Sequence, residues 1–563
     1  MTALPERADE ESPRLRRARA RRRAVRLCDR AALVVVAVWG LVTVSGAFPP
    51  QLDAAPGCSR ALVALGALLA AVLVVRRRID PITPLREVPL LVRAGGLAGR
   101  AWLTSARFVP GAFIVVLVLA ACGAVARYRG FASPAWGLAH FENILWNSLQ
   151  GRVGLSSFLG DRSLAVPVAP MLAVLVLPYA AIPRSETLLA VQAVALAWCV
   201  FPLARLARRE LGSASLAHAL VLAQAAYLPI RAVARYDFEP ALLAAPLLLE
   251  CLASIREGRM RRATGAWAAA LACHPAVIPA AAAIGLWVSS IRGRRSLGLM
   301  LTAGALLWGG AALLLARSLG ATDPWQVLVG PHAAVHDGFA PGWGAGTIAL
   351  VAFAPLCFLP VFAPAHALLA LPSLALAMAA AARSGAVGPH LATAAPLLLA
   401  ASTLGARTLI DRDDLRTVVA FYPTVAELES YLAGLLLVAA GAFVGWSPIA
   451  ELRLARADGR VARAELVTAL PPDRSVSTQA SVAVHLARRR DVAMFPDRLA
   501  PWIVLDGGRW PGPTMNASDG ARWSERLRGT HGCVTEAEAG AVARFHCDPG
   551  ALRALASWAA EAR

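Results

Sequence analysis

Apolar stretches long enough to cross a lipid bilayer recur along this chain and stop before residue 448. About 20 helical residues, each rising 1.5 Å, span a hydrocarbon core of about 30 Å. Shorter or ambiguous stretches lie at 164–182, 239–254 and 263–290. The pattern predicts an all-α polytopic transmembrane bundle with about 12 crossings. The clearest predicted helices cover 31–48, 58–75, 108–126, 186–206, 215–233, 297–316, 346–362, 365–382, 390–410 and 431–447.

Arginine-rich segments give the predicted orientation, because loops that stay in the cytoplasm carry an excess of basic residues. This orientation requires 164–182 to lie at the membrane surface or to re-enter, so that only 186–206 crosses back. It also requires 263–290 to enter and return around Cys273-His274-Pro275. The segments predicted to be cytoplasmic are the tail 1–30, the stretch from Arg76 to Arg107, and the loops 205–209, 256–262, 292–295 and 407–416.

The last part of the chain has a different pattern, with short apolar runs between Arg, Asp and Pro. Segments 475–478, 491–495 and 502–506 are predicted strands, and 480–490 is a helix between the first two. They form a small α/β domain that follows the last crossing and is therefore expected to be extracytoplasmic. Cys533 and Cys547 lie in this domain, and their pairing is left open.

The predicted domains follow from these patterns. They are a basic cytoplasmic tail at 1–30, two additional N-terminal helices with a basic loop at 31–107, a polytopic core at 108–447 with an outer loop at 127–163, and an extracytoplasmic α/β tail domain at 448–563.

Composition supports the membrane class, since 57% hydrophobic and 16% charged residues exceed what a soluble core can bury. A net charge of +20 would suit a nucleic-acid partner, but the arginines cluster beside apolar segments without interleaved aromatic residues. The expected partner is membrane lipid, with no nucleic acid.

Charged and polar side chains lie at the ends of the apolar segments. An ionisable group near hydrocarbon costs several kcal/mol unless it meets a partner or a wet cavity, so such groups are candidates for function. The predicted topology brings six of them to the outer face, where we expect the loop 127–163 to fold back over the bundle. They are Glu142, Asp161, Asp237, Glu239, His274 and His390.

Structural alternatives exist for each acidic group. Glu142 lies between Phe141 and Trp146, as a base beside an aromatic binding surface would, but aromatic residues also anchor helices at the interface. The adjacent Asp161 and Arg162 have the alternative of a solvated ion pair.

The charges that open the helix at 239–254 are Arg235, Asp237 and Glu239, and acidic residues there also cap helices. The alternatives for this cluster stay open.

The histidines carry weaker indications. His274 lies beside Pro275 and marks either a broken helix that lines a cavity or a structural buried residue. His390 could reach a lipid phosphate. His332 and His336 have metal-compatible spacing, but the Gly and Pro residues around them argue against a helix. No metal site is predicted.

A series of motifs carries a family resemblance. They are GLAHFENILWN at 137–147, LGDRSL at 159–164, Ala169-Pro170, LPY at 177–179, DFEPA at 237–241 and LPPDRSVSTQ at 470–479. In this order, over about residues 125–510, they resemble the bacterial polytopic membrane proteins called domain of unknown function 2079. The chain departs from that pattern where Glu142 replaces Asp, Arg162 and Glu239 each replace His, and Cys273-His274-Pro275 replaces a Lys-Glu-Asp stretch.

That family is similar in layout to membrane glycosyltransferases of the C-type fold, which implies a bacterial cell-membrane protein that transfers a sugar from a polyprenyl-phosphate donor to an envelope acceptor. Glu142 would be the base or a ligand of a divalent cation. The alternative is a membrane scaffold or transporter that keeps the fold without the chemistry. The other implied roles are assistance by Asp161, Asp237 and Glu239, phosphate binding by Arg162 or Arg235, and substrate contacts by Trp146, His274 and His390.

The orientation gives the first testable prediction. Reporter fusions at residues 90 and 520 are expected to report opposite sides of the membrane, because the basic loop before residue 107 is cytoplasmic and the tail domain is not. Fusions that reported the same side would show that the helix count is wrong, and the shared outer face would be lost.

Overall fold

The computed structural model describes residues 105–133, 136–158, 167–234, 238–320, 345–384, 390–412, 425–443, 460–506, 517–539 and 542–561, with isolated positions before residue 32. The first two predicted helices, at 31–48 and 58–75, and the histidines at 332 and 336 lie outside these residues.

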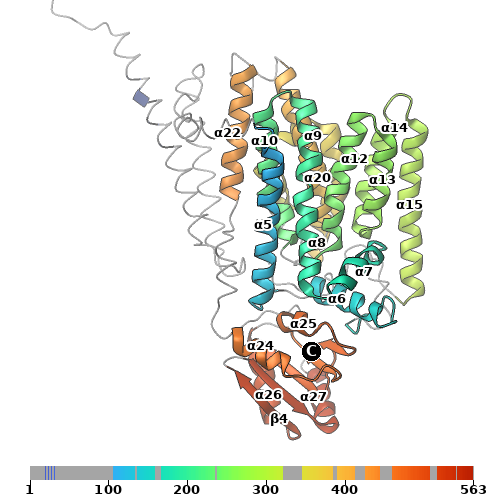
Figure 1. Cartoon of the computed structure of the whole chain (residues 1–563), viewed down its shortest axis with the longest axis vertical. Helices are drawn as coiled ribbons and strands as arrows, with labels where there is room; N and C mark the ends of the chain where they lie inside the picture. The colour runs from blue at the N-terminus through green and yellow to red at the C-terminus, as the bar shows by residue number, and fades with distance from the viewer. Residues whose placement is uncertain are drawn as a thin grey trace, which may run out of the picture.

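The described chain is mostly helical, with one small sheet (Figure 1). Five of its helices are long and apolar enough to cross a membrane: Phe108–Arg129, Ser185–Leu211, Arg295–Ser318, Pro364–Ala382 and His390–Asp411. Each coincides with one of the predicted apolar stretches. The total of about 12 crossings stays a prediction.

The helices of the bundle are α5 (Phe108–Arg129), α8 (Ser185–Trp198), α9 (Val200–Leu211), α10 (Ala214–Ala225), α11 (Leu228–Ala234), α12 (Pro240–Glu257), α13 (Met260–Leu271), η2 (Pro275–Val277), α14 (Ile278–Ser289), α15 (Arg295–Ser318), α17 (Ala345–Phe353), η4 (Ala354–Leu356), η5 (Leu359–Phe362), α18 (Pro364–Ala367), η6 (Leu368–Ala370), α19 (Leu371–Ser384), α20 (His390–Asp411) and α22 (Val425–Phe443).

Four of the predicted helices are interrupted, of which 186–206 at Cys199 and 365–382 at Leu368–Ala370 keep helical backbone through the break. The stretch 215–233 divides into α10 and α11 at Ala226 and Tyr227. The stretch 346–362 breaks after α17, because Cys357 and Phe358 adopt positive φ angles that an α-helix does not allow. The apolar pattern alone misses these breaks, although Pro229 lies in the first turn of α11 and Pro355 lies in η4.

The predicted break at Cys273-His274-Pro275 is present. α13 ends at Leu271, the His274 ring nitrogen Nδ1 accepts a hydrogen bond from the Ala276 amide at 3.0 Å, and η2 and α14 follow. This is the geometry of an N-cap, in which a side chain satisfies a backbone N–H that has no helical partner. α13 and α14 therefore form a short hairpin beside α12 and α15 (Figure 1).

Two short helices lie across one end of the bundle, α6 (Trp136–Leu149) and α7 (Met171–Ala181) (Figure 1). The Met171 amide, at the start of α7, donates to the Ala272 carbonyl at 2.9 Å and so ties α7 to the turn of the α13–α14 hairpin. α7 is 11 residues long, about 16 Å, which is shorter than a hydrocarbon core. It has the length that the predicted topology requires of 164–182.

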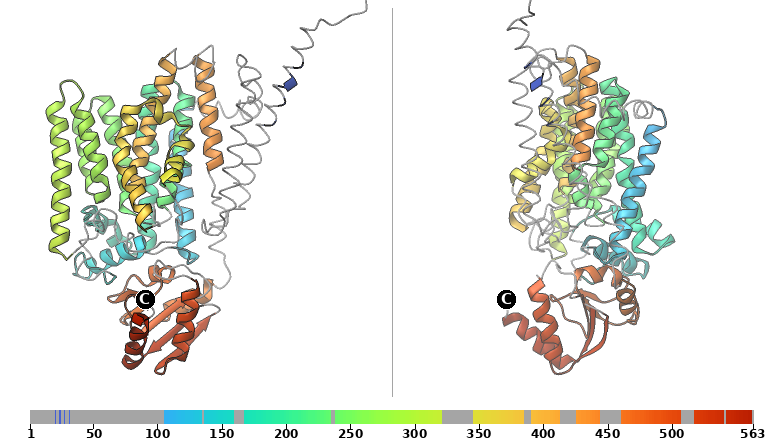
Figure 2. Two further views of the ribbon diagram at one scale, coloured as in Figure 1. Left: turned by 180° about the vertical axis from the view of Figure 1, so that it is seen from behind. Right: turned by 90° about the vertical axis from the view of Figure 1, so that its left-hand side faces the viewer.

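The tail domain lies at the same end of the bundle as α6 and α7, as two further views in Figure 2 show. Its sheet has the order β2-β1-β3-β5-β4, with β1 parallel to both β2 and β3 and with β5 antiparallel to β3 and β4. Its elements are α24 (Arg460–Thr468), β1 (Val476–Thr478), α25 (Ala480–Leu486), β2 (Val492–Met494), β3 (Trp502–Asp506), α26 (Ala517–Gly529), β4 (Cys533–Ala539), β5 (Val542–Cys547) and α27 (Pro549–Glu561).

The first three strands lie where the sequence predicts them, and α25 begins as predicted but ends at Leu486, four residues before the predicted end at Arg490. The hairpin β4–β5 was not predicted, because β4 carries two glutamates and forms the edge of the sheet. Cys533 and Cys547 stand opposite each other in this hairpin and form a disulfide. The extracytoplasmic location of the domain remains a prediction.

The helices α14 and α15 approach each other closely. A Cβ on Gly298 would lie 2.1 Å from the Ser289 amide nitrogen, so only glycine allows the two backbones to approach this closely. We expect Gly298→Ala to destabilise the protein by about 2 kcal/mol or more, because it overpacks against backbone that cannot turn away.

Gly310, in the same helix, is the matched control, since a Cβ there would meet nothing within 4 Å. Gly310→Ala is expected to be neutral or slightly stabilising, because alanine is the better helix former. Thermal unfolding of both purified variants in detergent measures the difference. Equal unfolding temperatures would contradict the close α14–α15 contact.

Candidate functional site

Glu142 is the centre of a buried polar cluster where α6, α7, α8 and the tail domain meet. Its side chain has no exposed surface. The Tyr179 hydroxyl donates to Oε1 at 3.1 Å, and the Ser185 hydroxyl donates to Oε2 at 2.5 Å. Arg488, from the loop that follows α25, places its Nε 3.8 Å from Oε1. Two consecutive helices and a distant loop of the tail domain therefore surround one carboxyl group.

Local structure brings these donors to Glu142. The extended backbone of Arg184 precedes α8, so Ser185 lies at the first position of that helix. Pro183 and Arg184 turn the chain between α7 and α8, which places Tyr179 and Ser185 on either side of the turn. A carboxylate beside the first turn of a helix is also favoured by the helix dipole.

Burial changes the acidity of Glu142. Loss of hydration is the largest cause and raises its pKa from 4.5 to about 7, while the hydrogen bonds from Ser185 and Tyr179 and the charge of Arg488 act in the opposite direction. A buried carboxyl prefers its neutral form because the charged form has lost its water. Near neutral pH, Glu142 is poised between the two forms, as a general acid or base requires.

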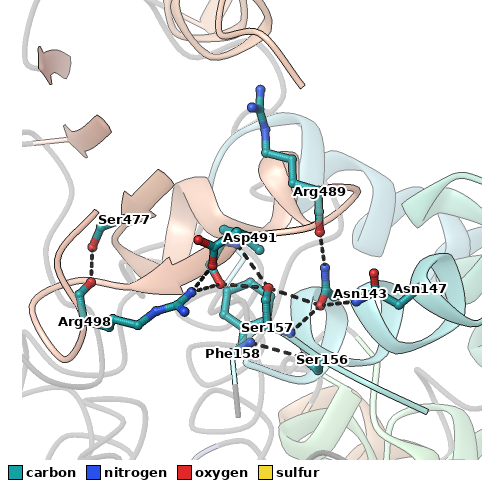
Figure 3. A network of polar contacts seen from close by, with 10 residues as sticks. Asn143, Asn147, Ser156, Ser157, Phe158, Ser477, Arg489, Asp491 and Arg498 are labelled. Carbon is teal, nitrogen blue, oxygen red and sulfur yellow. Dashed lines mark hydrogen bonds and ion pairs between the residues drawn. The ribbon is translucent and has the colours of Figure 1, made fainter. Parts of the chain in front are cut away.

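Asn143, the next residue on α6, joins the bundle to the tail domain (Figure 3). Its side-chain amide donates to the Ala487 and Arg489 carbonyls at 2.6 and 2.9 Å. Its oxygen accepts from the Ser157 amide at 2.8 Å. Ser157 also bonds to both backbone groups of Val492 in β2. We call these contacts of Asn143 and Ser157 with 487–492 the Asn143 latch.

A second buried cluster contains Glu239, His274 and His390. Glu239 caps α12, since its carboxylate accepts from the Ala241 amide at 3.4 Å, and His274 Nε2 lies 3.8 Å from Glu239 Oε1. His390 begins α20 and is fully buried near His274 and Glu239. The structure thus brings together three of the predicted site residues, and the capping alternative for Glu239 also applies.

The two clusters are neighbours. The Phe141 and Phe238 rings, each adjacent in sequence to one of the carboxylates, contact edge to face with centroids 5.7 Å apart. Ser185 binds Glu142, while the side-chain oxygen of Gln192 accepts from the Glu239 amide at 2.7 Å. Ser185 and Gln192 are seven residues apart on one face of α8, or about 10 Å along its axis. One helix therefore carries both clusters.

A cavity of about 370 Å³ lies beside this helix, between α5, α8, α10 and α11. Its walls are mostly apolar and include Leu119, Leu189 and Val221, and its charged lining residues are Arg127 and Arg231. Arg127 is in the last turn of α5 and donates to the Ala234 carbonyl at 3.2 Å, and Arg231 is in α11. The cavity therefore has mostly apolar walls and two arginines in its lining.

The remaining predicted site residues have other outcomes. Asp161, Arg162, Arg235 and Asp237 lie outside the described residues, so their predicted roles stay predictions. Trp146 packs partly buried against the core, and the Arg152 guanidinium lies 5.6 Å from its ring centroid. Trp146 lies about one helical turn after Glu142 on α6.

Tyr179, Ser185, Gln192 and Arg488 were not predicted. Tyr179 lies in the LPY motif, which was noted only for its resemblance, and Ser185 and Gln192 are common helix residues. Arg488 is one of three consecutive arginines, so the sequence gives no sign of which one faces the bundle.

The described residues contain no group of three His, Cys, Asp or Glu side chains that could hold a metal ion. The described neighbours of the Glu142 carboxylate are the hydroxyl groups of Tyr179 and Ser185 and the guanidinium of Arg488. This surrounding suits proton exchange better than cation binding, since a cation requires several oxygen ligands in place of hydrogen-bond donors.

The chain is similar to a solved structure and to a family of membrane proteins. The structure of ArnT from Cupriavidus metallidurans in the apo state is similar, with a TM-score of 0.44 and 13% sequence identity over 78% of this chain and 98% of that one. No curated protein matches the sequence. Residues 127–316, which contain both polar clusters except for His390 and Arg488, match the family model of the predicted membrane proteins DUF2079, so the resemblance to this family is confirmed over that part of the chain.

Proposed function

We propose that this protein is a membrane glycosyltransferase that transfers a sugar from a polyprenyl-phosphate donor to a cell-envelope acceptor, with Glu142 as the general base. The observation that carries the proposal is the Glu142 cluster: a fully buried carboxyl, with a pKa of about 7, that already accepts hydrogen bonds from two hydroxyl groups. A base in inverting transfer must accept a proton from a hydroxyl, and no covalent protein intermediate is needed.

The adjacent cavity supports the lipid half of the proposal. Val115 and Leu119 line the cavity and are about half exposed, so its wall reaches the outer surface of α5. Val115 lies 12 residues before Arg127, about 18 Å along the helix. A lipid phosphate would lie at Arg127 and Arg231, where guanidinium groups suit phosphate oxygens, and the first part of the prenyl chain would lie among the apolar residues.

The cavity is also close to both carboxylates. Leu189 and Gln192 line it, one and two turns after Ser185 on α8, and Gln192 holds the amide of Glu239. In the proposed arrangement, the donor phosphate and Glu142 lie on the same side of α8. Glu239 and His274 then form the inner wall of the site, while Asp161, Asp237, Arg162 and Arg235 are proposed to complete it from the outer segments.

A structural role is the second candidate, and one observation favours it. The hydrogen bonds of Tyr179 and Ser185 satisfy the Glu142 carboxyl within the protein, as in an anchor that fixes α6 on the bundle. The protein would then be a membrane scaffold or transporter that keeps the fold without the transfer reaction.

Replacement of the carboxyl separates the two candidates. Glu142→Gln is expected to lower transfer at least about 100-fold while the variant remains folded and inserted, because it removes the proton acceptor and keeps the shape. The measurement is transfer of label from polyprenyl-phosphate sugars to envelope extract by protein in nanodiscs. Glu525→Gln, which changes an exposed acid on α26, is the control for loss of a carboxyl and should keep its activity.

The pH dependence gives a check that does not need the sugar to be known. Because the folded-state pKa of Glu142 is raised from 4.5 to about 7, its contribution to stability is complete below pH 4.5 and is lost as the pH rises through 7. Glu142→Gln should lack this loss in thermal unfolding experiments.

In the transfer experiment, unchanged transfer by Glu142→Gln would exclude Glu142 as the base, and a variant that fails to fold would favour the anchor.

The lipid site gives a further prediction. Arg127→Gln is expected to weaken binding of polyprenyl phosphate about tenfold, because a hydrogen-bonded charge is lost, and to leave binding of the uncharged polyprenol unchanged. Native mass spectrometry of the purified protein with each lipid measures this. Arg129→Gln, two residues further along and not in the cavity lining, is the control. Equal losses in both arginine variants would contradict a specific phosphate position.

A further inference from the structure

The tail domain contacts the bundle beside Glu142 through α25, through β2 and through the loop between them. His485 of α25 bonds to the Tyr128 carbonyl at 3.1 Å, and Ser157 bonds to Val492 of β2. Residues 487–491 form the loop, and the Ala487 and Arg489 carbonyls both accept hydrogen bonds from the Asn143 side chain. These two carbonyls lie on either side of Arg488 in the chain. One buried amide therefore fixes the backbone immediately before and after this arginine.

Asn143 is itself rigidly held. Its side-chain oxygen accepts from the Ser157 amide, the Ser157 hydroxyl and the Asn147 amide at 2.8, 3.3 and 3.0 Å (Figure 3). Its side chain is fully buried. A buried amide with every donor and acceptor satisfied has one favoured orientation, because any other would leave a polar group without a partner.

Neighbouring arginines of the loop point in opposite directions. The Arg489 guanidinium turns into the tail domain and donates to the Leu470 and Pro471 carbonyls. The Arg488 guanidinium turns to the bundle, where Nη1 donates to the Pro183 carbonyl at 3.1 Å and Nε lies 3.8 Å from Glu142. Arg489 thus stabilises the tail domain, and Arg488 points to the Glu142 site.

We propose that the tail domain is part of the Glu142 site, that Arg488 is its positioning residue, and that the Asn143 latch delivers Arg488 to the carboxylate. Arg488 contacts the loop between α7 and α8 as well as Glu142, so it fixes the charged group and the wall around it. Asn143 and Glu142 are adjacent on α6, and docking of the tail domain is therefore coupled to the surroundings of the carboxyl.

This inference rests on the proposed function only for the catalytic meaning of Glu142, and the contacts that carry it are independent of any reaction. The groups that face Glu142 come from every element packed on it: Tyr179 from α7, Ser185 and Glu186 from α8, Tyr128 from the end of α5, and Arg488. Of these, Arg488 carries the positive charge. Glu186 faces Arg129 at 3.5 Å.

Infrared spectroscopy tests the proposal without an activity assay. The full-length protein in nanodiscs is titrated, and the protonated carboxyl band that disappears in Glu142→Gln reports the charge of Glu142. Arg488→Gln is expected to move the midpoint of this titration upward by about half a pH unit, because the nearby positive charge is lost while half of the Arg488 side chain is exposed to solvent. Arg488→Lys keeps the positive charge and should return the midpoint most of the way to the wild-type value.

Arg490→Gln is the matched control, since this exposed arginine lies two residues away and removes the same charge from the same loop. It should leave the midpoint unchanged. An unchanged midpoint in Arg488→Gln, or an equal shift in Arg490→Gln, would overturn the proposal whether or not the protein transfers a sugar.

Removal of the latch tests the delivery step. Asn143→Ala adds no charge and should shift the midpoint in the same direction as Arg488→Gln, and the double variant should shift it no further, because both changes remove the same contact. Fully additive shifts would show that Arg488 reaches Glu142 without the latch. If Asn143→Ala does not fold, the Arg488 and Arg490 variants alone decide the proposal.

Discussion

A carboxylate away from water must obtain its hydrogen bonds and its counter-charge from the protein, and this constraint organises the described structure. Its buried acidic side chains are Glu142, Glu210, Glu239 and Asp506. Glu210 binds Arg256 and Arg407, at 2.7 and 2.5 Å, and so joins α9, α12 and α20. Asp506 binds Arg463 at 3.1 Å in the tail domain. Burial of each charge is tolerated because separate segments converge on it.

The two ends of the bundle use this constraint differently. Near Glu210, each acid meets guanidinium groups at hydrogen-bond distance, as Arg205 does with Glu250 and Glu257 at 2.8 and 3.0 Å. Such fully paired groups are suited to holding helices together. Glu142 instead meets hydroxyl groups and a half-exposed arginine at a longer distance, which leaves its proton exchangeable near neutral pH. The contrast supports chemistry at the Glu142 end and structure at the Glu210 end.

The helix α6 contacts the core of the bundle, the helices around Glu142 and the tail domain. Phe141 packs into the core against Phe238, Glu142 faces α7 and α8, and Asn143 binds the tail domain. Three consecutive residues can do this because successive side chains of a helix point about 100° apart. The bundle, the candidate base and the tail domain therefore all contact the same short helix, so a displacement of α6 changes the contacts of all three.

The sequence by itself determined the membrane class, the apolar spans, the break at His274 and the first three strands of the tail domain. These depend on local composition and periodicity, which each segment carries within itself. It also indicated Glu142, Glu239, His274 and His390, because polar residues among apolar ones are conspicuous. Their separation into two clusters on one face of α8 depends on packing between segments that are distant in the chain.

Only the tertiary structure identified the partners of these groups. Tyr179, Ser185, Gln192 and Arg488 are unremarkable in the sequence, and Arg488 lies about 350 residues after the carboxyl that it faces. The pairing of β4 with β5 and the positions of the helix breaks near Tyr227 and Cys357 are likewise seen only in the structure. A hydrogen bond depends on position in space to within a few tenths of an ångström, and no local pattern in the chain encodes that position.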